Sequence, residues 1–346
     1  MRKAIALLCL FPALAISTSA SAGVAYPDPP GGWAYTYSGD GAAPGTNGET
    51  EYNSDNGRFD ALDGTWDHTN DSDQWNGTYS ATDGGVRSQN GYLTIVDRKT
   101  SGSNKKLYFA HDIGPVDTAM DTILDTGVTL SFRGRLTVNE DWPTAKGLEI
   151  RNSGKGMWGI HQAKIHDPAN PNPDDVRGER ISFGLVTGTE HANLQGKSGL
   201  VVNRGGSITA TRNVDTDDPM APATLRILEM PRDSLTDWHE FWITIVADPR
   251  PGDDGGTHRV DIYVDGALTP QTFWVSVSSG LNDYPSLGQG ATIWRNYIAM
   301  GSSRSGNTGA FDTDFFSWAP GVIAPIPEPA TISLLAIALP VLVRRR

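Results

Sequence analysis

The segment that decides the fold reads Asp237-Trp238-His239-Glu240-Phe241-Trp242-Ile243-Thr244-Ile245. Successive side chains of a β-strand point to opposite faces, so Trp238 and Trp242 would share one face of this strand. Phe241 and Ile243 would lie on the opposite face. Large apolar side chains on both faces are typical of a central strand that is covered on both sides. The segment therefore predicts a buried strand within a sheet.

The rest of the chain contains many shorter runs of the same alternating or apolar kind. The 346 residues include 39 Gly and 22 Pro, and 38% are hydrophobic and 20% charged. About fourteen short alternating or apolar runs are separated by Gly, Asn, Asp and Pro, whereas helix signals are scarce. The dipeptide Asp265-Gly266 predicts a tight turn between two strands. The 10 tryptophans suit the layer of roughly 10 Å between two packed sheets. An all-β sandwich follows.

Four motifs in order resemble the concanavalin A-like lectin/glucanase superfamily, and especially its laminin-G-like branch. The motifs are Asp237 to Ile245, then Val260-Asp261-Ile262-Tyr263-Val264-Asp265-Gly266, then Ile298-Ala299-Met300-Gly301-Ser302, and Phe311-Asp312-Thr313-Asp314-Phe315-Phe316. The resemblance implies a jelly-roll sandwich of two antiparallel sheets over residues 23–326. That superfamily contains lectins, adhesion modules, glycoside hydrolases and lyases, so the fold alone does not name an activity.

The N-terminus has the pattern of a secretory signal peptide. Met1-Arg2-Lys3 is followed by an apolar run and then by the small residues Ala20-Ser21-Ala22. We expect cleavage after Ala22, with Ala20 and Ala22 as the cleavage-site residues. The single cysteine, Cys9, lies within this peptide, so residues 23–346 have no disulfide and no thiol nucleophile.

The C-terminus resembles the PEP-CTERM sorting signal of exported bacterial proteins. It reads Pro327-Glu328-Pro329, then an uncharged, mostly apolar stretch from Ala330 to Val343, then Arg344-Arg345-Arg346. The apolar stretch would form a helix of about 21 Å, which is short for a hydrocarbon core of roughly 30 Å. The resemblance implies a sorting helix over residues 327–346, transient insertion in a membrane, and an exosortase-type membrane protease as a partner.

The charge balance disfavours one class of partner. The whole chain has a formal net charge of −12, and residues 23–326 carry 23 basic and 39 acidic residues. Binding to nucleic acid backbones needs clustered Lys and Arg, so we expect no nucleic acid partner. A polysaccharide remains a candidate ligand.

No catalytic motif stands out. Retaining glycoside hydrolysis needs two carboxyl groups about 5 Å apart, and the sequence has no Glu-x-Asp-x-x-Glu string. Asp261 and Asp265 share a strand face but lie about 13 Å apart along it, which is too far for such a pair. We therefore expect a protein without enzymatic activity.

Structural calcium is the one expected cofactor, because this hard cation prefers oxygen ligands. In the superfamily an aspartate on the closing strand often helps to hold calcium, which implies this role for Asp314 or Asp312. The acidic loop that contains Asp71 and Asp73 is a second candidate, although it lacks the spacing of an EF-hand.

Sugar binding usually combines an exposed aromatic ring with a few polar partners. Trp142, Trp158 and Trp294 fall at predicted strand ends or loops and are the candidate platforms.

The leading hypothesis is an exported protein of the cell surface, outer envelope or extracellular matrix, whose β-sandwich binds glycans or mediates adhesion without catalysis. One alternative is a polysaccharide-cleaving hydrolase or lyase on the same scaffold, which a paired acidic cluster on the concave sheet would distinguish. The other is a purely structural matrix protein.

The sorting hypothesis is tested by deletion of residues 327–346. We expect the truncated protein to change its distribution between cell surface and medium, as measured by fractionation and immunoblotting. Unchanged localisation would contradict the sorting role of this segment.

Overall fold

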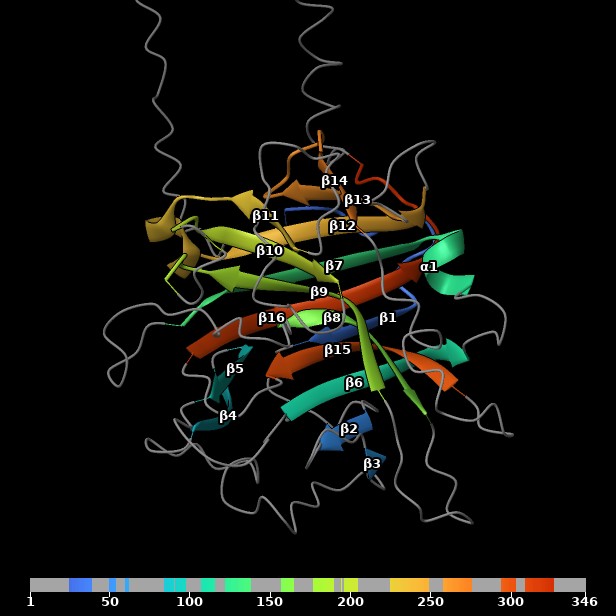
Figure 1. Cartoon of the computed structure of the whole chain (residues 1–346), viewed down its shortest axis with the longest axis horizontal. Coiled ribbons are helices and arrows are strands. Elements are labelled where there is room, and N and C mark those ends of the chain that lie inside the picture. Colours follow the sequence, from blue (N-terminus) through green and yellow to red (C-terminus); the bar gives the residue numbers. More distant parts are fainter. Residues whose placement is uncertain are drawn as a thin grey trace, which may run out of the picture.

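The chain folds into a two-layer β-sandwich. The computed structural model describes residues 25–38, 50–53, 60–61, 84–89, 91–97, 107–115, 122–137, 157–164, 177–189, 194, 196–204, 225–248, 258–275, 294–302 and 309–326. In these residues the strands form two antiparallel sheets, here called sheet A and sheet B (Figure 1). The prediction of an all-β sandwich of two antiparallel sheets is confirmed.

Sheet A contains, near its middle, the strand predicted from the segment Asp237 to Ile245. In spatial order it consists of β14 (Gln271–Val275), β13 (His258–Val264), β12 (His239–Ala247), β7 (Val128–Leu136), β16 (Gly309–Pro320), β5 (Tyr92–Asp97) and β4 (Gly84–Gln89), and β1 (Tyr35–Ser38) also pairs with β16. Sheet neighbours such as β7 and β16 are distant in sequence, as in a jelly roll.

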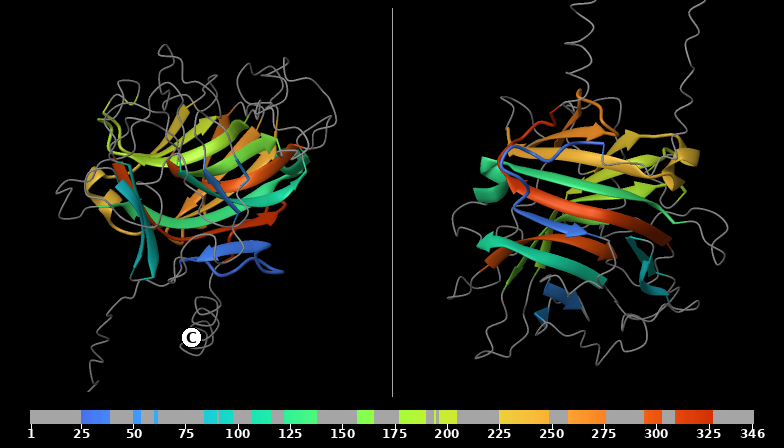
Figure 2. Two further views of the ribbon diagram at one scale, coloured as in Figure 1. Left: turned by 90° about the horizontal axis from the view of Figure 1, so that it is seen from below. Right: turned by 180° about the vertical axis from the view of Figure 1, so that it is seen from behind.

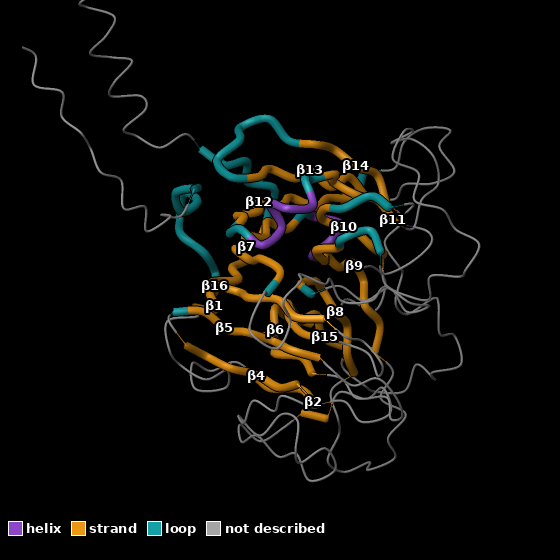
Figure 3. The backbone as a smooth tube through the Cα atoms, turned by 90° about the vertical axis from the view of Figure 1, so that its left-hand side faces the viewer, coloured by secondary structure: helices purple, strands orange, loops and turns teal. Residues whose placement is uncertain are grey.

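Sheet B forms the second layer. In spatial order it consists of β11 (Leu225–Glu229), β10 (Gly199–Arg204), β9 (Arg177–Val186), β8 (Trp158–Lys164), β15 (Trp294–Ser302), β6 (Leu107–Pro115), β2 (Thr50–Asn53) and β3 (Asp60–Ala61). Figure 2 (left) shows the sheets as two curved layers, and Figure 3 shows β7 and β16 on one side with β8 and β9 on the other. The short helix α1 (Thr122–Thr126) and the 3-10 helix Arg232–Thr236 complete the described elements.

The alternation predicted for β12 is confirmed. Phe241 and Ile243 belong to the main core between the sheets, whereas Trp242 packs on the outer side of sheet A with Tyr26 and Tyr263. The inner face of the strand is covered by the core, and its outer face at Trp242 is covered by Tyr26, Trp33 and Ile323. Its hydrogen-bonding edges are paired with β7 and β13, so both faces and both edges are buried.

The predicted tight turn after β13 is also present. Asp265 and Gly266 have φ values of 51° and 82°, in the left-handed region. The N–H of Ala267 donates to the carbonyl of Val264 at 3.0 Å. The Asp-Gly dipeptide thus supplies the backbone conformation that this reversal needs.

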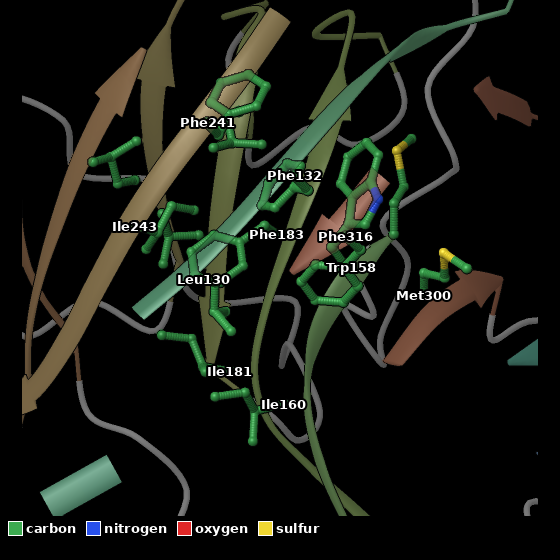
Figure 4. Packing of buried hydrophobic residues seen from close by; sticks show 14 of the residues in the cluster. Leu130, Phe132, Trp158, Ile160, Ile181, Phe183, Phe241, Ile243, Met300 and Phe316 are labelled. Carbon is green, nitrogen blue, oxygen red and sulfur yellow. The ribbon is translucent and has the colours of Figure 1, made fainter. Parts of the chain in front are cut away.

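Phe132 on β7 is the centre of the core (Figure 4). Its ring stacks on Trp158 of β8 in the opposite sheet, with centroids 4.4 Å apart and planes at 15°. Phe241 and Phe316, on the strands flanking β7, lie 5.2 and 5.9 Å from it. The Trp158 indole N–H donates to the hydroxyl of Thr313 at 3.0 Å, so the polar atom of this buried ring has a partner.

Gly134 makes room for this indole. A Cβ atom added to Gly134 would lie 2.4 Å from Cζ2 of Trp158 and 3.1 Å from the carbonyl oxygen of Asp312. These distances are too short for a methyl group. The ring therefore fits over β7 only because residue 134 has no side chain.

Among the described residues, no helix has the length and apolar composition needed to cross a bilayer. The predicted signal peptide and sorting helix lie outside those residues, and they stay predictions.

We predict that Gly134→Ala destabilises the body by about 1 to 3 kcal/mol, because overpacking forces the Trp158 ring or β7 to shift. Urea unfolding measures the change. Gln271→Ala, at an exposed position of β14, is the control and should change stability by no more than about 0.5 kcal/mol. A Gly134→Ala protein as stable as the wild type would show that the indole does not rest on this glycine.

Candidate functional site

The outer face of sheet A carries a row of polar and aromatic side chains. Glu240 of β12 lies opposite Arg133 of β7, and Arg133 in turn lies opposite Phe315 of β16. Two residues further along each strand, and on the same face, the register aligns Trp242 with Ser131 and Ser131 with Ser317. These residues alternate with the core residues, so they face away from sheet B.

The N-terminal segment, defined here as residues 25–34, covers part of this row. The backbone N–H groups of Ala25 and Tyr26 donate to the two carboxyl oxygens of Glu240, the second at 3.2 Å. The Tyr26 hydroxyl donates to the carbonyl of Ala267 at 3.2 Å. Trp33 packs on Trp242 with centroids 4.8 Å apart. In Figure 2 this segment, in blue, lies on the side of sheet A that faces away from sheet B.

The chain returns to the same face at its other end. The indole N–H of Trp242 donates to the carbonyl of Ile323 at 2.7 Å, and the N–H of Ile323 donates to the hydroxyl of Thr129 at 3.0 Å. Residues 25 and 326, the first and last that the structure describes, thus belong to two segments that meet around Trp242.

A cavity of about 270 Å³ lies between the N-terminal segment and sheet A. Its wall combines two carboxyl groups, aromatic rings and hydroxyls. The lining residues are Tyr26, Asp28, Trp33, Thr36, Ser38, Ser131, Glu240, Phe315 and Ser317. Asp28 is exposed and accepts a hydrogen bond from the Trp33 indole at 2.9 Å, whereas Glu240 is only 3% exposed.

Burial raises the pKa of Glu240 from 4.5 to about 7. The N–H groups of Ala25 and Tyr26 and the charge of Arg133 act in the opposite direction, and the charge of Asp265 adds to the rise. Desolvation of the charged form outweighs the hydrogen bonds to it. Glu240 is therefore still partly protonated at neutral pH, whereas an ordinary glutamate is ionised.

His239, the neighbour of Glu240, joins the strand to the turn and to the 3-10 helix. Its Nδ1 lies 2.7 Å from Asp265 and its Nε2 lies 2.9 Å from the carbonyl of Ser234. Burial alone would lower the pKa of His239, but the hydrogen bond and charge of Asp265, together with Ser234 and Asp237, raise it. Asp265 also accepts the backbone N–H of Glu240 at 2.8 Å.

Two ion pairs extend the row beyond the cavity. Arg133 pairs with Asp314 at 2.9 Å, and Arg135 pairs with Asp312 at 2.8 Å. Both guanidinium groups lie over the ring of Trp238, 5.2 and 4.5 Å from its centroid. Trp238 is thus held by cation–π contacts on the outer face of sheet A.

The outer face of sheet B is different at its centre. Its described side chains there, which alternate with the core residues of β8, β9, β10, β11 and β15, are small or apolar: Gly159, Ser182, Val186, Val201, Ile227 and Ala299. These residues form no paired acidic cluster, which was the signature expected for a hydrolase or lyase. The two carboxyl groups that line one cavity come instead from β12 of sheet A, with Glu240, and from the N-terminal segment, with Asp28.

The prediction of Trp158 as a sugar platform is wrong. This residue is 0% exposed and its ring packs between the sheets, so it cannot meet a ligand at the surface. Trp294 is the first residue of β15, and its side chain lies outside the description. Trp142 lies outside the described residues altogether.

The calcium candidates on β16 are occupied by protein donors. Asp312 is buried and accepts hydrogen bonds from Thr94, Arg135 and Thr137, at 2.8, 2.8 and 2.5 Å. Asp314 pairs with Arg133. In the described ranges, no three His, Cys, Asp or Glu side chains are grouped so that they could hold a metal ion. Asp71 and Asp73 lie outside those ranges, and calcium binding stays a prediction.

The remaining predicted residues belong to the two ends of the chain. Ala20, Ala22, Pro327, Glu328, Pro329, Arg344, Arg345 and Arg346 all lie outside the described residues. Signal cleavage and sorting therefore stay predictions.

Glu240 was not among the predicted site residues. The signal for it was present, because it is the one carboxylate within the apolar run from Trp238 to Ile245. A carboxyl group on a strand with two covered faces has to be desolvated, and desolvation shifts its pKa. What the sequence does not reveal is that residues 25–34 supply the cover.

No family model matches the chain, and no curated protein matches it. Solved structures do. An endo-1,3-beta-glucanase from Streptomyces sioyaensis is 15% identical, with 84% of this chain and 98% of that chain covered and a TM-score of 0.34. A beta-1,3-glucanase from Mycobacterium marinum is 13% identical, with 83% and 98% covered and a TM-score of 0.29. A glycosyl hydrolase family 16 protein from Mycobacterium smegmatis is 11% identical, with 83% and 100% covered and a TM-score of 0.31.

The expectation of a protein without enzymatic activity is not upheld: the solved structures that match are glucanases and a glycosyl hydrolase. At such identities and TM-scores they transfer neither a substrate nor a catalytic residue to this chain. The residues that could perform a reaction have to be identified from the geometry of this chain.

The raised pKa values predict a stability that falls with increasing pH. Glu240 and His239 bind their protons more tightly in the folded than in the unfolded chain, whose ordinary pKa values are 4.5 and 6.5. Their stabilising contribution is complete below those values and is lost as the pH rises, for Glu240 through about 7. Urea midpoints should decrease from pH 5 to pH 8.

Glu240→Gln should weaken this dependence and leave the part that is due to His239. Glu229→Gln, at a carboxylate whose side chain is 57% exposed, should keep the wild-type dependence. A Glu240→Gln protein with the full wild-type slope would show that Glu240 titrates normally in the fold.

Proposed function

We propose that this chain is an exported polysaccharide-cleaving enzyme, a glycoside hydrolase whose site is the cavity between residues 25–34 and the outer face of sheet A. The observation that carries the proposal is a carboxyl group with a pKa of about 7, Glu240, in the wall of a cavity that also contains a second carboxyl group, Asp28. Glycoside hydrolysis uses two carboxyl groups in different protonation states.

Glu240 has the property required of a general acid. Its raised pKa keeps the proton available near neutral pH, where an ordinary glutamate would already have lost it. In the proposed reaction this proton passes to the glycosidic oxygen as the bond from that oxygen to the anomeric carbon breaks. The leaving sugar departs as a neutral alcohol.

Asp28 supplies the second role. It is exposed at the rim of the same cavity, where water solvates it, in contrast to the buried Glu240. Its carboxylate stabilises the positive charge that develops on the anomeric carbon. Water then adds its oxygen to this carbon, and its proton returns to the carboxyl pair, so that Glu240 is protonated again.

The other lining residues suit a sugar ring. Tyr26, Trp33 and Phe315 provide apolar surface against which a ring face can pack. The hydroxyls of Thr36, Ser131 and Ser317 provide donors and acceptors for its edges, and Thr36 and Ser317 already bond each other at 2.8 Å.

The termini support a role outside the cytoplasm. The predicted signal peptide would export the chain, and the PEP-CTERM-like end would direct it through an exosortase-type protease to the cell surface, outer envelope or matrix. Polysaccharides are abundant there, and an acidic body suits a substrate without phosphate.

The test measures reducing-sugar release by the purified protein on a polysaccharide panel that begins with β-1,3-glucan. We expect saturable release near neutral pH, and a loss of at least about 100-fold in kcat for Glu240→Gln, the range typical of a lost general acid. Asp28→Asn should also lower kcat. Glu229→Gln, remote from the cavity lining, is the matched control and should retain activity.

If the protein releases no product from any polysaccharide on the panel, the proposal is overturned. Product release that survives Glu240→Gln would place the site elsewhere in the chain.

A further inference from the structure

The N-terminal segment is attached to sheet A by hydrogen bonds and by the packing of two aromatic rings. Residues 25–34 belong to no strand, and β1 starts only at Tyr35. The segment is attached by the N–H groups of Ala25 and Tyr26, which donate to Glu240, by the Tyr26 hydroxyl, which donates to Ala267, and by the packing of the Tyr26 and Trp33 rings on Trp242. The N–H of Ala34 then donates to the carbonyl of Trp318 at 2.9 Å, next to the start of β1.

The sequence of this segment divides it into a stiff arm and a pivot. Pro27, Pro29 and Pro30 restrict the backbone of the arm. Gly31 and Gly32 follow with φ values of +96° and +78°, and an added Cβ atom at either would meet nothing within 4 Å. Glycine adopts positive φ without steric cost and both positions lie in open space, which suits a pivot. The turn hydrogen bond from the N–H of Gly32 to the carbonyl of Pro29, at 2.8 Å, has to open with it.

We propose that Ala25–Pro30 is a lid that pivots at Gly31–Gly32, opens to admit a ligand to the cavity, and closes to bury the carboxyl group of Glu240. The identity of the ligand as a polysaccharide rests on the function proposed above, whereas the movement of the lid is independent of that function. In the closed state the lid contributes Tyr26 and Asp28 to the cavity wall, so closure also assembles the two carboxyl groups.

Closure and the proton of Glu240 are linked. The charged or titratable groups around this carboxyl are Arg133 of β7, Asp265 of the turn after β13, and Tyr26 and Asp28 of the lid itself. Arg133 is paired with Asp314, and Asp265 with His239, so neither is an isolated charge. Opening of the lid takes Tyr26 and Asp28 away, leaves Arg133 and Asp265 in place, and admits water to the carboxyl group.

The direction of the linkage follows from burial. Burial raises the pKa of Glu240 to about 7 in the closed state, and hydration in the open state returns it toward the ordinary value of 4.5. The open state therefore binds protons more weakly and is favoured as the pH rises. Between pH 5 and pH 8 the opening equilibrium should increase on the order of 50-fold.

The experiment follows hydrogen exchange of the Ala25 and Tyr26 amides by NMR in the purified protein, expressed as protection factors relative to the unfolded chain. Wild-type protection of these two amides should fall on the order of 50-fold from pH 5 to pH 8, while that of the β12 amides falls much less. In Glu240→Gln the two amides should lose this dependence, and in Glu229→Gln they should keep it.

A hinge variant tests the pivot without touching the carboxyl group. Gly32→Ala places a side chain at positive φ in open space, so it disfavours the closed backbone without a clash. Exchange at Ala25 and Tyr26 should increase about 3- to 10-fold at constant pH, with the urea midpoint of the body unchanged.

Two results would overturn the lid: protection of Ala25 and Tyr26 that matches β12 at every pH, or a pH dependence that Glu240→Gln retains. Because exchange needs no substrate, the two proposals fail separately. A pH-dependent lid in a protein that cleaves no polysaccharide would refute the hydrolase alone, and activity with uniformly protected amides would refute the lid alone.

Discussion

The stack of Phe132 on Trp158 is the contact on which the arrangement of the two sheets depends. It joins the middle of sheet A to the middle of sheet B, with ring centroids 4.4 Å apart. Gly134 provides the space for the indole, and Thr313 accepts its N–H. Displacing either sheet along the other would cost ring contact and leave a buried donor without an acceptor. One aromatic pair thus fixes both the separation and the register of the layers.

The outer face of sheet A follows from this inner contact. Because Phe132 points inward, the alternation of side chains along β7 makes Ser131 and Arg133 point outward. The pairing with β12 and β16 then aligns Glu240 and Phe315 beside them. The same alternation turns Asp312 outward to meet Arg135. The aspartates that resemble calcium ligands are, in the described fold, partners of arginines that pack on Trp238.

The sequence predicts the features that depend on local periodicity. The two faces of β12 and the turn at Asp265-Gly266 follow from neighbouring residues alone, and the all-β sandwich follows from the repetition of such patterns. The position of Trp158 could not be predicted in this way. Its burial depends on Gly134, a residue of another strand in the opposite sheet. The cavity is also beyond local patterns, since its lining brings together the N-terminal segment, β1, β7, β12 and β16.

Glu240 raises a question that its hydrogen bonds alone do not answer. Two backbone N–H groups donate to its two oxygens, and a glutamine at this position would accept one of them through its single carbonyl oxygen, without the cost of burying a charge. A carboxyl group performs the same task only by taking up a proton or by holding a desolvated charge beside Asp265. A glutamate therefore makes the attachment of residues 25–34 depend on protonation, whereas an amide would make it independent of pH. The desolvation of Glu240 weakens the attachment of residues 25–34 at high pH and also keeps a proton beside the cavity at neutral pH. The pH-dependent attachment of the segment and the proposed general acid are therefore consequences of one buried carboxyl group.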